Sequence, residues 1–392
     1  MAGRRSAVEN NGRRWGWKRP RPPIGKEDDV PRSRVFLVGF LAAVFIGTGA
    51  VGAFSSRPLP VEIQDAAGRT VRLEKLPQRI LAIGHGPQII AHLMFMFPES
   101  RERFIGWERR GSTASEFIPL IDEAFDKRVF PNPNAGVEEV AALRPDLVLM
   151  RGTQSDPKGE ALVRLGIPVA YLGLEDPLQY RKDIICVGAL LGNPARAGEI
   201  NRFFRDRLDR IERALAGLSD VGKPSVLLAM TISRGAKIAV EVPAIPWMQT
   251  VQVKLAGGKP IWEEAAASSS GWTVVNLEQI ARWNPDRIIL VIWHSMDPRK
   301  TIEELKADPR WRELRAVRNG EIRAYPSDIY GWDTPDPRWI LGIIWLAKTL
   351  HPDRFAGLEM KAEVAAFYRE LYGMTDEDVA LKILPAIRMD YR

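Results

Sequence analysis

The chain has 392 residues, of which 45% are hydrophobic and 27% charged, and its net charge is +7. This composition supports a sizeable hydrophobic core and excludes a disordered chain, and the length predicts two domains or two lobes. The positive charge is concentrated at the start, because residues 1–34 hold ten Lys/Arg against four Asp/Glu, while the residues after 54 are almost balanced. Nucleic acid is therefore not an expected partner, since a nucleic-acid binder needs that charge on its folded part.

Residues 35–54 form an uncharged apolar stretch that is long enough to cross a membrane as a helix. Arg32 and Arg34 precede it, so the positive-inside rule predicts a basic cytoplasmic tail over 1–34 and a periplasmic location for everything after 54. A retained anchor, favoured by the length, is preferred over a cleaved signal peptide, which the small residues 51–53 would allow. We expect an N-terminal transmembrane helix.

The strand pattern after this segment predicts an α/β protein. Alternating apolar residues over 61–65 and 68–73 predict two short strands around a turn. Buried strands are expected at 79–83, 147–150, 169–172, 226–230 and 288–292, separated by helical patterns. Such alternation is typical of parallel sheets wrapped by helices.

A long helix is predicted between the two halves. Asn193 and Pro194 suit the N-cap and first helical position, and apolar residues recur at helical spacing as far as Gly217. This gives an N-terminal lobe over 60–192, a connecting helix over 193–219 and a C-terminal lobe over 224–392. Cys186, the only cysteine, lies in an apolar run and is expected in the core, so we predict no disulfide, metal site or cofactor.

An internal repeat with an offset of 140 residues is the most specific signal in the chain. Residues 137–149 and 277–289 share an apolar-Glu-x-apolar-Ala pattern, then Pro-Asp, then an apolar run. Each copy predicts a short helix, a turn and a buried strand. The chain therefore carries one α/β plan twice.

With these motifs the chain resembles the iron-complex and cobalamin-binding family of periplasmic receptors over roughly residues 60–350. The resemblance rests on both repeats, on the long helix, and on residues 65–80, 166–169 and 332–350. It implies two Rossmann-like lobes joined by a single long helix, with a ligand cleft between them. It also implies the substrate-binding component of an ABC importer, which captures an iron-siderophore, haem or corrinoid chelate and delivers it to a permease and its ATPase.

The family uses one surface glutamate on each lobe to contact arginines of the permease, and the matching positions here are Glu138 and Glu278. Alternatively, both glutamates are ordinary solvent-exposed carboxylates near helix N-termini, where the helix dipole favours negative charge. The duplication favours docking.

Ligands of open α/β sheets bind beyond the carboxyl ends of the strands, so candidate contacts follow the predicted strands. On the first lobe they are His85, Trp107, Arg109, Arg110 and Arg151. On the second they are Arg234, Trp247, Trp272, Trp293, His294, Tyr330, Trp332 and Asp333. Metal chelates present apolar faces and anionic edges, which aromatic walls and arginines recognise.

Several of these residues have a structural alternative. Any single tryptophan can be a core residue, although the resemblance places Trp272 and Trp332 in ligand-contact loops. His85 and His294 are expected as contacts, because a lone histidine after a strand is more often a hydrogen-bonded structural residue than a metal ligand. The run from Asp333 to Pro337 is interpreted as a rigid turn that leads into a helix, and not as a cation site.

Three other classes remain open: an enzyme on a twin Rossmann-like scaffold, a related receptor for an oxyanion such as molybdate, and a signalling module with the receptor fold. The enzyme is disfavoured, since the sequence has no Gly-x-Ser-x-Gly, His-Glu-x-x-His or Gly-x-x-x-x-Gly-Lys motif and only four histidines.

Overall fold

The computed structural model describes residues 60–109, 116–234, 237–292 and 296–388, with backbone alone for 232–234 and 237–239. The predicted membrane segment 35–54 lies outside these ranges. Within them, every helix is too short or too polar to cross a bilayer.

The N-terminal lobe is built on a four-stranded parallel sheet in the order β4-β3-β5-β6. Its strands are β3 (Ile80–Ile83), β4 (Phe104–Trp107), β5 (Leu147–Arg151) and β6 (Val169–Leu172), and its helices are α1 (Pro87–Met94), α2 (Ser100–Arg103), α3 (Val137–Ala142), α4 (Pro157–Arg164) and α5 (Pro177–Leu190). The antiparallel hairpin of β1 (Val61–Gln64) and β2 (Thr70–Leu73) precedes the sheet. All four residues of β3 and of β6 are buried, because helices cover a parallel sheet on both faces. The predicted strands of this lobe are confirmed, and β4 was not predicted.

The C-terminal lobe has a mixed six-stranded sheet in the order β10-β8-β7-β11-β12, with β9 paired to β7. Its strands are β7 (Ser225–Arg234), β8 (Lys237–Val242), β9 (Lys259–Pro260), β10 (Thr273–Val275), β11 (Arg287–Ile292) and β12 (Ile322–Ala324). The helices that follow are α7 (Met248–Leu255), α8 (Leu277–Trp283), α9 (Pro298–Ala307), α10 (Pro309–Arg312) and α11 (Arg315–Arg318).

The parallel central sheet expected for this lobe is found in strands β9, β7, β11 and β12, but the sheet as a whole is mixed. Strand β8 runs antiparallel to both of its neighbours, β7 and β10, and it begins three residues after β7 ends. Such a short connection cannot hold the crossover that parallel neighbours need.

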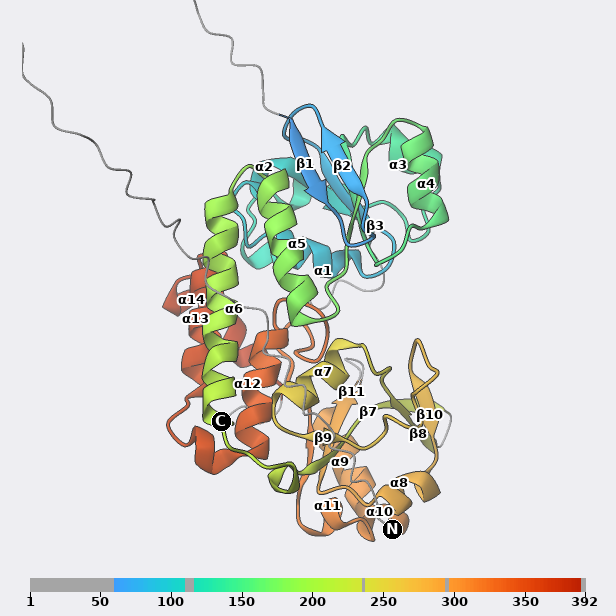
Figure 1. Cartoon of the computed structure of the whole chain (residues 1–392), viewed down its shortest axis with the longest axis vertical. Coiled ribbons are helices and arrows are strands. Elements are labelled where there is room, and N and C mark those ends of the chain that lie inside the picture. The colour runs from blue at the N-terminus through green and yellow to red at the C-terminus, as the bar shows by residue number, and fades with distance from the viewer. Residues whose placement is uncertain (1–59, 110–115, 235–236, 293–295, 389–392) are drawn as a thin grey trace, which may run out of the picture. The chain divides into compact units, whose positions relative to one another are not determined.

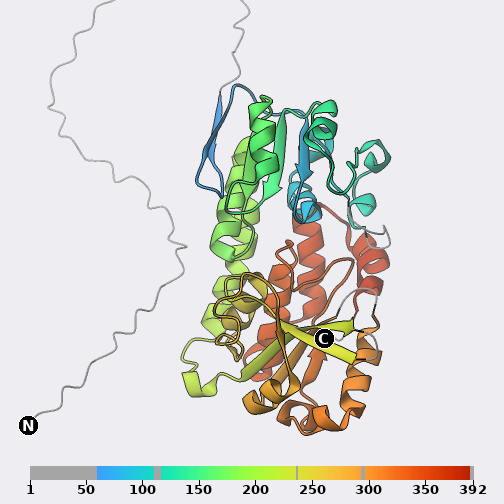
Figure 2. The same cartoon turned by 90° about the vertical axis from the view of Figure 1, so that its right-hand side faces the viewer.

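The long helix α6 (Pro194–Ala214) connects the two lobes, as predicted (Figures 1 and 2). The Asn193 side chain caps it by accepting a hydrogen bond from the backbone N–H of Arg196 at 2.9 Å. Beside α6 lie α12 (Trp339–Leu350) and α13 (Met360–Tyr372), followed by the short α14 (Asp376–Asp378) (Figure 1). Arg207 on α6 pairs with Glu363 on α13 at 3.0 Å, which fixes the two helices together.

The internal repeat is also a repeat of geometry. The two helix-turn-strand units are α3 with β5 and α8 with β11. In each unit the residue before the Pro-Asp pair has a positive φ, 51° at Arg144 and 41° at Asn284. Asp146 then accepts the backbone N–H of Arg79 at 2.8 Å, just before β3. Asp286 likewise accepts the backbone N–H of Ser225 at 2.8 Å, at the start of β7. The Pro-Asp pair therefore ties each unit to the neighbouring strand.

Candidate functional site

The first side of the site consists of the loops that follow β3, β5 and β6. Arg151 ends β5, and its guanidinium forms an ion pair with Glu175, which follows β6. Gly86, with a φ of 62°, lies against this arginine, since a Cβ there would come within 2.9 Å of Arg151 Nη1. His85 precedes it and is exposed. A glycine at 86 therefore leaves room for the arginine beside the N-terminus of α1.

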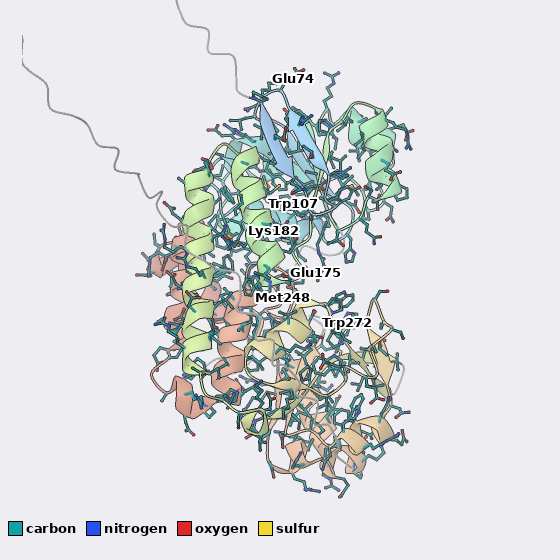
Figure 3. All side chains as sticks on the ribbon, viewed as in Figure 1. Glu74, Trp107, Glu175, Lys182, Met248 and Trp272 are labelled. Atoms are coloured by element: carbon teal, nitrogen blue, oxygen red, sulfur yellow. The ribbon has the colours of Figure 1, made fainter. Side chains whose placement is uncertain are left out.

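The loop that follows β12 supplies the opposite side. Burial raises the pKa of the Tyr330 hydroxyl, and the charge of Arg151 is close enough to oppose that rise. The Tyr330 ring meets the edge of the His92 ring with centroids 5.3 Å apart, so this loop lies against α1, the helix whose N-terminal Gly86 lies against Arg151. Figure 3 shows Glu175 at the edge of the N-terminal lobe that faces the C-terminal lobe.

A pair of tryptophans extends the second side. Trp247 is the N-cap residue of α7, and its ring meets that of Trp272 edge to face with centroids 5.8 Å apart. Both side chains are half-buried, and Trp272 lies at the edge of its lobe that faces the other one (Figure 3). Two rigid aromatic surfaces are thus partly open to a ligand.

Asp333 is a buried carboxyl group beside this pair. Its Oδ2 accepts a hydrogen bond of 3.3 Å from the Gln249 amide, in the first turn of α7. Burial raises the pKa of Asp333 to about 6, against the opposing effect of the Gln249 hydrogen bond. The side chain therefore changes charge close to neutral pH.

Comparison with known proteins identifies the class of this molecule. Residues 127–329, just over half of the chain, match the model of the periplasmic binding protein family. The chain belongs to that family. An uncharacterized ABC transporter substrate-binding lipoprotein of Bacillus subtilis, YvrC, is 25% identical over 312 residues, which are 76% of this chain and 87% of the relative.

Two proteins of known structure share the fold. The molybdate-binding protein MolA of Haemophilus influenzae is 31% identical over 109 residues, 28% of this chain and 30% of the relative. Its structure with bound molybdate superposes with a TM-score of 0.62 at 18% identity, over 80% of this chain and 98% of that one. A nickel–histidine complex of Helicobacter pylori CeuE gives a TM-score of 0.63 at 18% identity, over 82% and 98%.

Two tryptophans that we expected at the ligand lie in the interior of this periplasmic binding protein. Trp107 is 1% exposed and stacks on Phe104 with centroids 5.8 Å apart. Trp332 is fully buried, and its indole N–H donates to Asp328 at 3.1 Å. A buried ring cannot contact a ligand. The prediction that Trp107 and Trp332 contact the ligand is therefore wrong, and both residues belong to the core.

Arg109 keeps a partly open position. Its guanidinium, 24% exposed, donates to Glu116 at 2.6 Å and lies 4.8 Å from the centroid of the Phe130 ring. The other expected contacts, Arg110, Trp293, His294 and the side chain of Arg234, lie outside the described residues.

The two expected docking glutamates occupy equivalent positions. Glu138 on α3 and Glu278 on α8 are both exposed, each in the first turn of its helix. Asp308, with a smaller contribution from Glu278, raises the pKa of Arg310. Glu278 therefore has a basic neighbour on its own surface.

Sequence reasoning missed the partners of the site residues. Glu175 forms an ion pair with Arg151, and Gln249 donates a hydrogen bond to Asp333. Neither partner lies in a sequence motif, so neither was predicted. Cys186 is buried as predicted, and burial raises the pKa of its thiol.

We expect Asp333→Asn to stabilise the ligand-free protein at high pH. The pKa of this carboxyl is about 6 in the folded protein against 3.8 for the free group, so the wild type loses stability as pH rises from about 4 to above 6. The loss amounts to at most about 3 kcal/mol above pH 7. An amide cannot ionise, so the gain in melting temperature should be large near pH 8 and small near pH 4.

Asp308→Asn is the control for that measurement. Its carboxyl is bound by Arg310, which lowers its pKa, so removing this charge should give no gain at high pH. An Asp333→Asn gain that is independent of pH would show that this carboxyl is not forced to ionise in a buried position.

Proposed function

We propose that this chain, the substrate-binding component of an ABC transporter, captures a metal chelate outside the cytoplasmic membrane and delivers it to the permease and its ATPase. Family membership supports the receptor class, and YvrC is named as a substrate-binding lipoprotein. The proposed ligand is an iron-siderophore, haem or corrinoid complex. The receptor function needs no turnover, in contrast to an enzyme with the same scaffold.

The half-buried pair of Trp247 and Trp272 on one lobe, together with Arg151 on the other, is the observation that supports the chelate proposal. A chelate has an organic shell with apolar faces, for which two partly open rings provide contact area. It also has anionic oxygens, which an arginine binds through several N–H groups. Tyr330, in the loop after β12, is proposed as a further contact.

Trp272→Ala is expected to weaken binding of a ferric chelate by about five- to a hundred-fold, or roughly 1–3 kcal/mol. The loss follows from removal of one aromatic wall, and fluorescence or calorimetric titration measures it. The control is Trp283→Ala, because Trp283 is also half-buried but ends α8, which lies before β11 and away from its carboxyl end. Trp332→Ala should lower the melting temperature through a core cavity. Equal affinity losses in the Trp272 and Trp283 variants would contradict the assignment.

An oxyanion is the second candidate ligand. MolA is named as molybdate-binding, and the helices α1 and α7 here have no acidic residue in the first turn and no side-chain cap. Such helix starts favour anions. Titration of the purified protein with ferric chelates and with molybdate separates the two candidates. If residues 55–392 are purified with a chelate still bound, their metal content and absorbance spectrum would reveal it. Turnover of a candidate substrate would instead support an enzyme.

We also propose that residues 35–54 anchor the receptor to the membrane, with residues 1–34 in the cytoplasm. The charge pattern supports this topology. A reporter that is active only outside the cytoplasm should be active when fused after residue 60. Activity of a cytoplasm-only reporter at the same position would overturn both the topology and the importer proposal.

A further inference from the structure

A cluster of polar side chains is completely buried where α1 meets the segment 328–338. His92, Asp336, Arg338 and Tyr368 are each 0% exposed and Asp328 is 7% exposed. The Arg338 guanidinium donates to Asp336 Oδ1 and lies against Asp328 Oδ1, both at 2.8 Å. Tyr368 donates to Asp328 Oδ2 at 2.5 Å. Ionic groups without water are costly to bury, and the two aspartates offset that cost by pairing with the Arg338 guanidinium.

The cluster joins the two lobes. His92 lies on α1 of the N-terminal lobe, and its Nδ1 is hydrogen bonded to Asp336 Oδ2. Tyr372 on α13 donates to the backbone carbonyl of His92 at 3.1 Å. Phe117, also from the N-terminal lobe, packs against Tyr372 with centroids 4.7 Å apart and lies 4.7 Å from Arg338 Cζ. Helix α13, which lies in the part of the chain that we expected to form the C-terminal lobe, thus also contacts the N-terminal lobe.

The protonation states follow from the surroundings. Burial by itself would raise the pKa of Asp336, but the adjacent Arg338 and His92 bring it down to about 2, so this group is a carboxylate. Burial lowers the pKa of His92, so the imidazole is neutral at pH 7 and its hydrogen is on Nδ1, facing that carboxylate. The imidazole is therefore the side-chain donor through which the N-terminal lobe holds Asp336.

Tyr330 depends on the same cluster. Its backbone N–H donates to Asp328 Oδ1 at 3.0 Å, and its ring meets the edge of the His92 ring with centroids 5.3 Å apart. The loop that carries Tyr330 is thus held in place by residues of both lobes. Movement of one lobe against the other would break the bond between His92 and Asp336 and withdraw that support.

We infer that the cluster of His92, Asp328, Asp336, Arg338 and Tyr368 is a fixed bridge that holds the lobes at one spacing, with His92 as the residue that positions Tyr330 for the ligand. The receptor then binds with its two sides already in place, which lowers the ordering cost of association. The role of Tyr330 rests on the proposed function, whereas the fixed spacing does not. His92 is a positioning residue and touches no ligand.

Spin labels on the two lobes test the spacing in the ligand-free protein. Leu165→Cys and Val274→Cys provide sites that are 58% and 55% exposed, one in each lobe, while the native Cys186 is buried and stays unlabelled. We expect a narrow distance distribution by electron paramagnetic resonance in the otherwise unchanged protein. His92→Leu, which removes the donor to Asp336, should broaden it, and His92→Asn, whose amide reaches the position of Nδ1, should keep it narrow.

His351→Leu is the matched control. His351 is also buried, but its Nε2 is hydrogen bonded to the Gly257 carbonyl at 3.1 Å within the C-terminal lobe. This variant should lower the melting temperature and leave the distance distribution unchanged. A folded His92→Leu protein with an unchanged narrow distribution would overturn the bridge.

Hydrogen exchange of the unmodified protein provides a second measurement that does not depend on the variants. If the bridge holds, the amides of α1 and α13 should open together, with the same protection. Independent exchange of the two helices would contradict it. In the folded variants, His92→Leu should also weaken ferric-chelate binding about ten-fold or more, with rescue by His92→Asn. A broadened distribution with unchanged chelate affinity would leave the spacing supported and overturn the positioning of Tyr330.

Discussion

Uptake should be abolished in the double variant Glu138→Arg with Glu278→Arg, while ligand affinity stays nearly the same. The two glutamates occupy equivalent exposed positions in the first turns of α3 and α8, one on each lobe. If each pairs with an arginine of the permease, reversal turns two attractions into two repulsions, which costs several kcal/mol at the interface. Transport of a radiolabelled chelate and titration of the purified receptor measure the two effects separately.

Glu160→Arg and Glu303→Arg are the controls for that experiment. Both residues are exposed glutamates on other helices, α4 of the N-terminal lobe and α9 of the C-terminal lobe. Their reversal changes the net charge by the same amount, so uptake should remain close to that of the wild type. Equal loss of uptake in both double variants would indicate a general charge effect. Loss of ligand affinity in the Glu138 and Glu278 variant would place these side chains at the ligand.

The buried strands and the repeat could be predicted because their signals are local. β3 and β6 are short apolar runs between turn residues, and both are completely buried. In the repeat, Pro-Asp marked the turn, and the structure adds the reason: Asp146 and Asp286 each bind the backbone before the adjacent strand. A prediction of this kind needs no knowledge of distant partners.

The missed strands gave weaker signals. β12 has three residues and β10 has three, which is too short for a recognisable alternation. The sequence did not predict β8 or the hairpin that makes it antiparallel to β7. The antiparallel part of this sheet was therefore not predicted.

The site could be predicted only in part, because burial is decided by distant contacts. Trp272, directly before β10, and Trp332, after β12, both lie in loops, yet the first is half-buried against Trp247 while the second is enclosed and bound to Asp328. The bridge was invisible for the same reason. His92 sits in an apolar helix, and its partner Asp336 is 244 residues away.

Arg338→Met should destabilise the protein by about 3–5 kcal/mol, the range expected when one member of a buried ion pair is removed. Methionine is apolar and of similar length, so the main loss is electrostatic. Asp328 keeps Tyr368 and the Trp332 indole as donors, and Asp336 keeps His92, but both carboxylates lose their only cation of full charge among the described residues. Denaturant unfolding of the ligand-free protein measures the change.

Two further variants separate the loss of charge from the loss of packing. Arg310→Met removes an arginine that is 74% exposed and paired with Asp308, and surface pairs of this kind are worth at most about 1 kcal/mol. Adding Asp328→Asn and Asp336→Asn to Arg338→Met removes the two carboxyl groups that have lost their cation, so stability should recover in part. Equal destabilisation in the single and triple variants would show that Arg338 acts by filling space. Recovery would show that the three charges are retained as a set, which is the condition for a fixed bridge between the lobes.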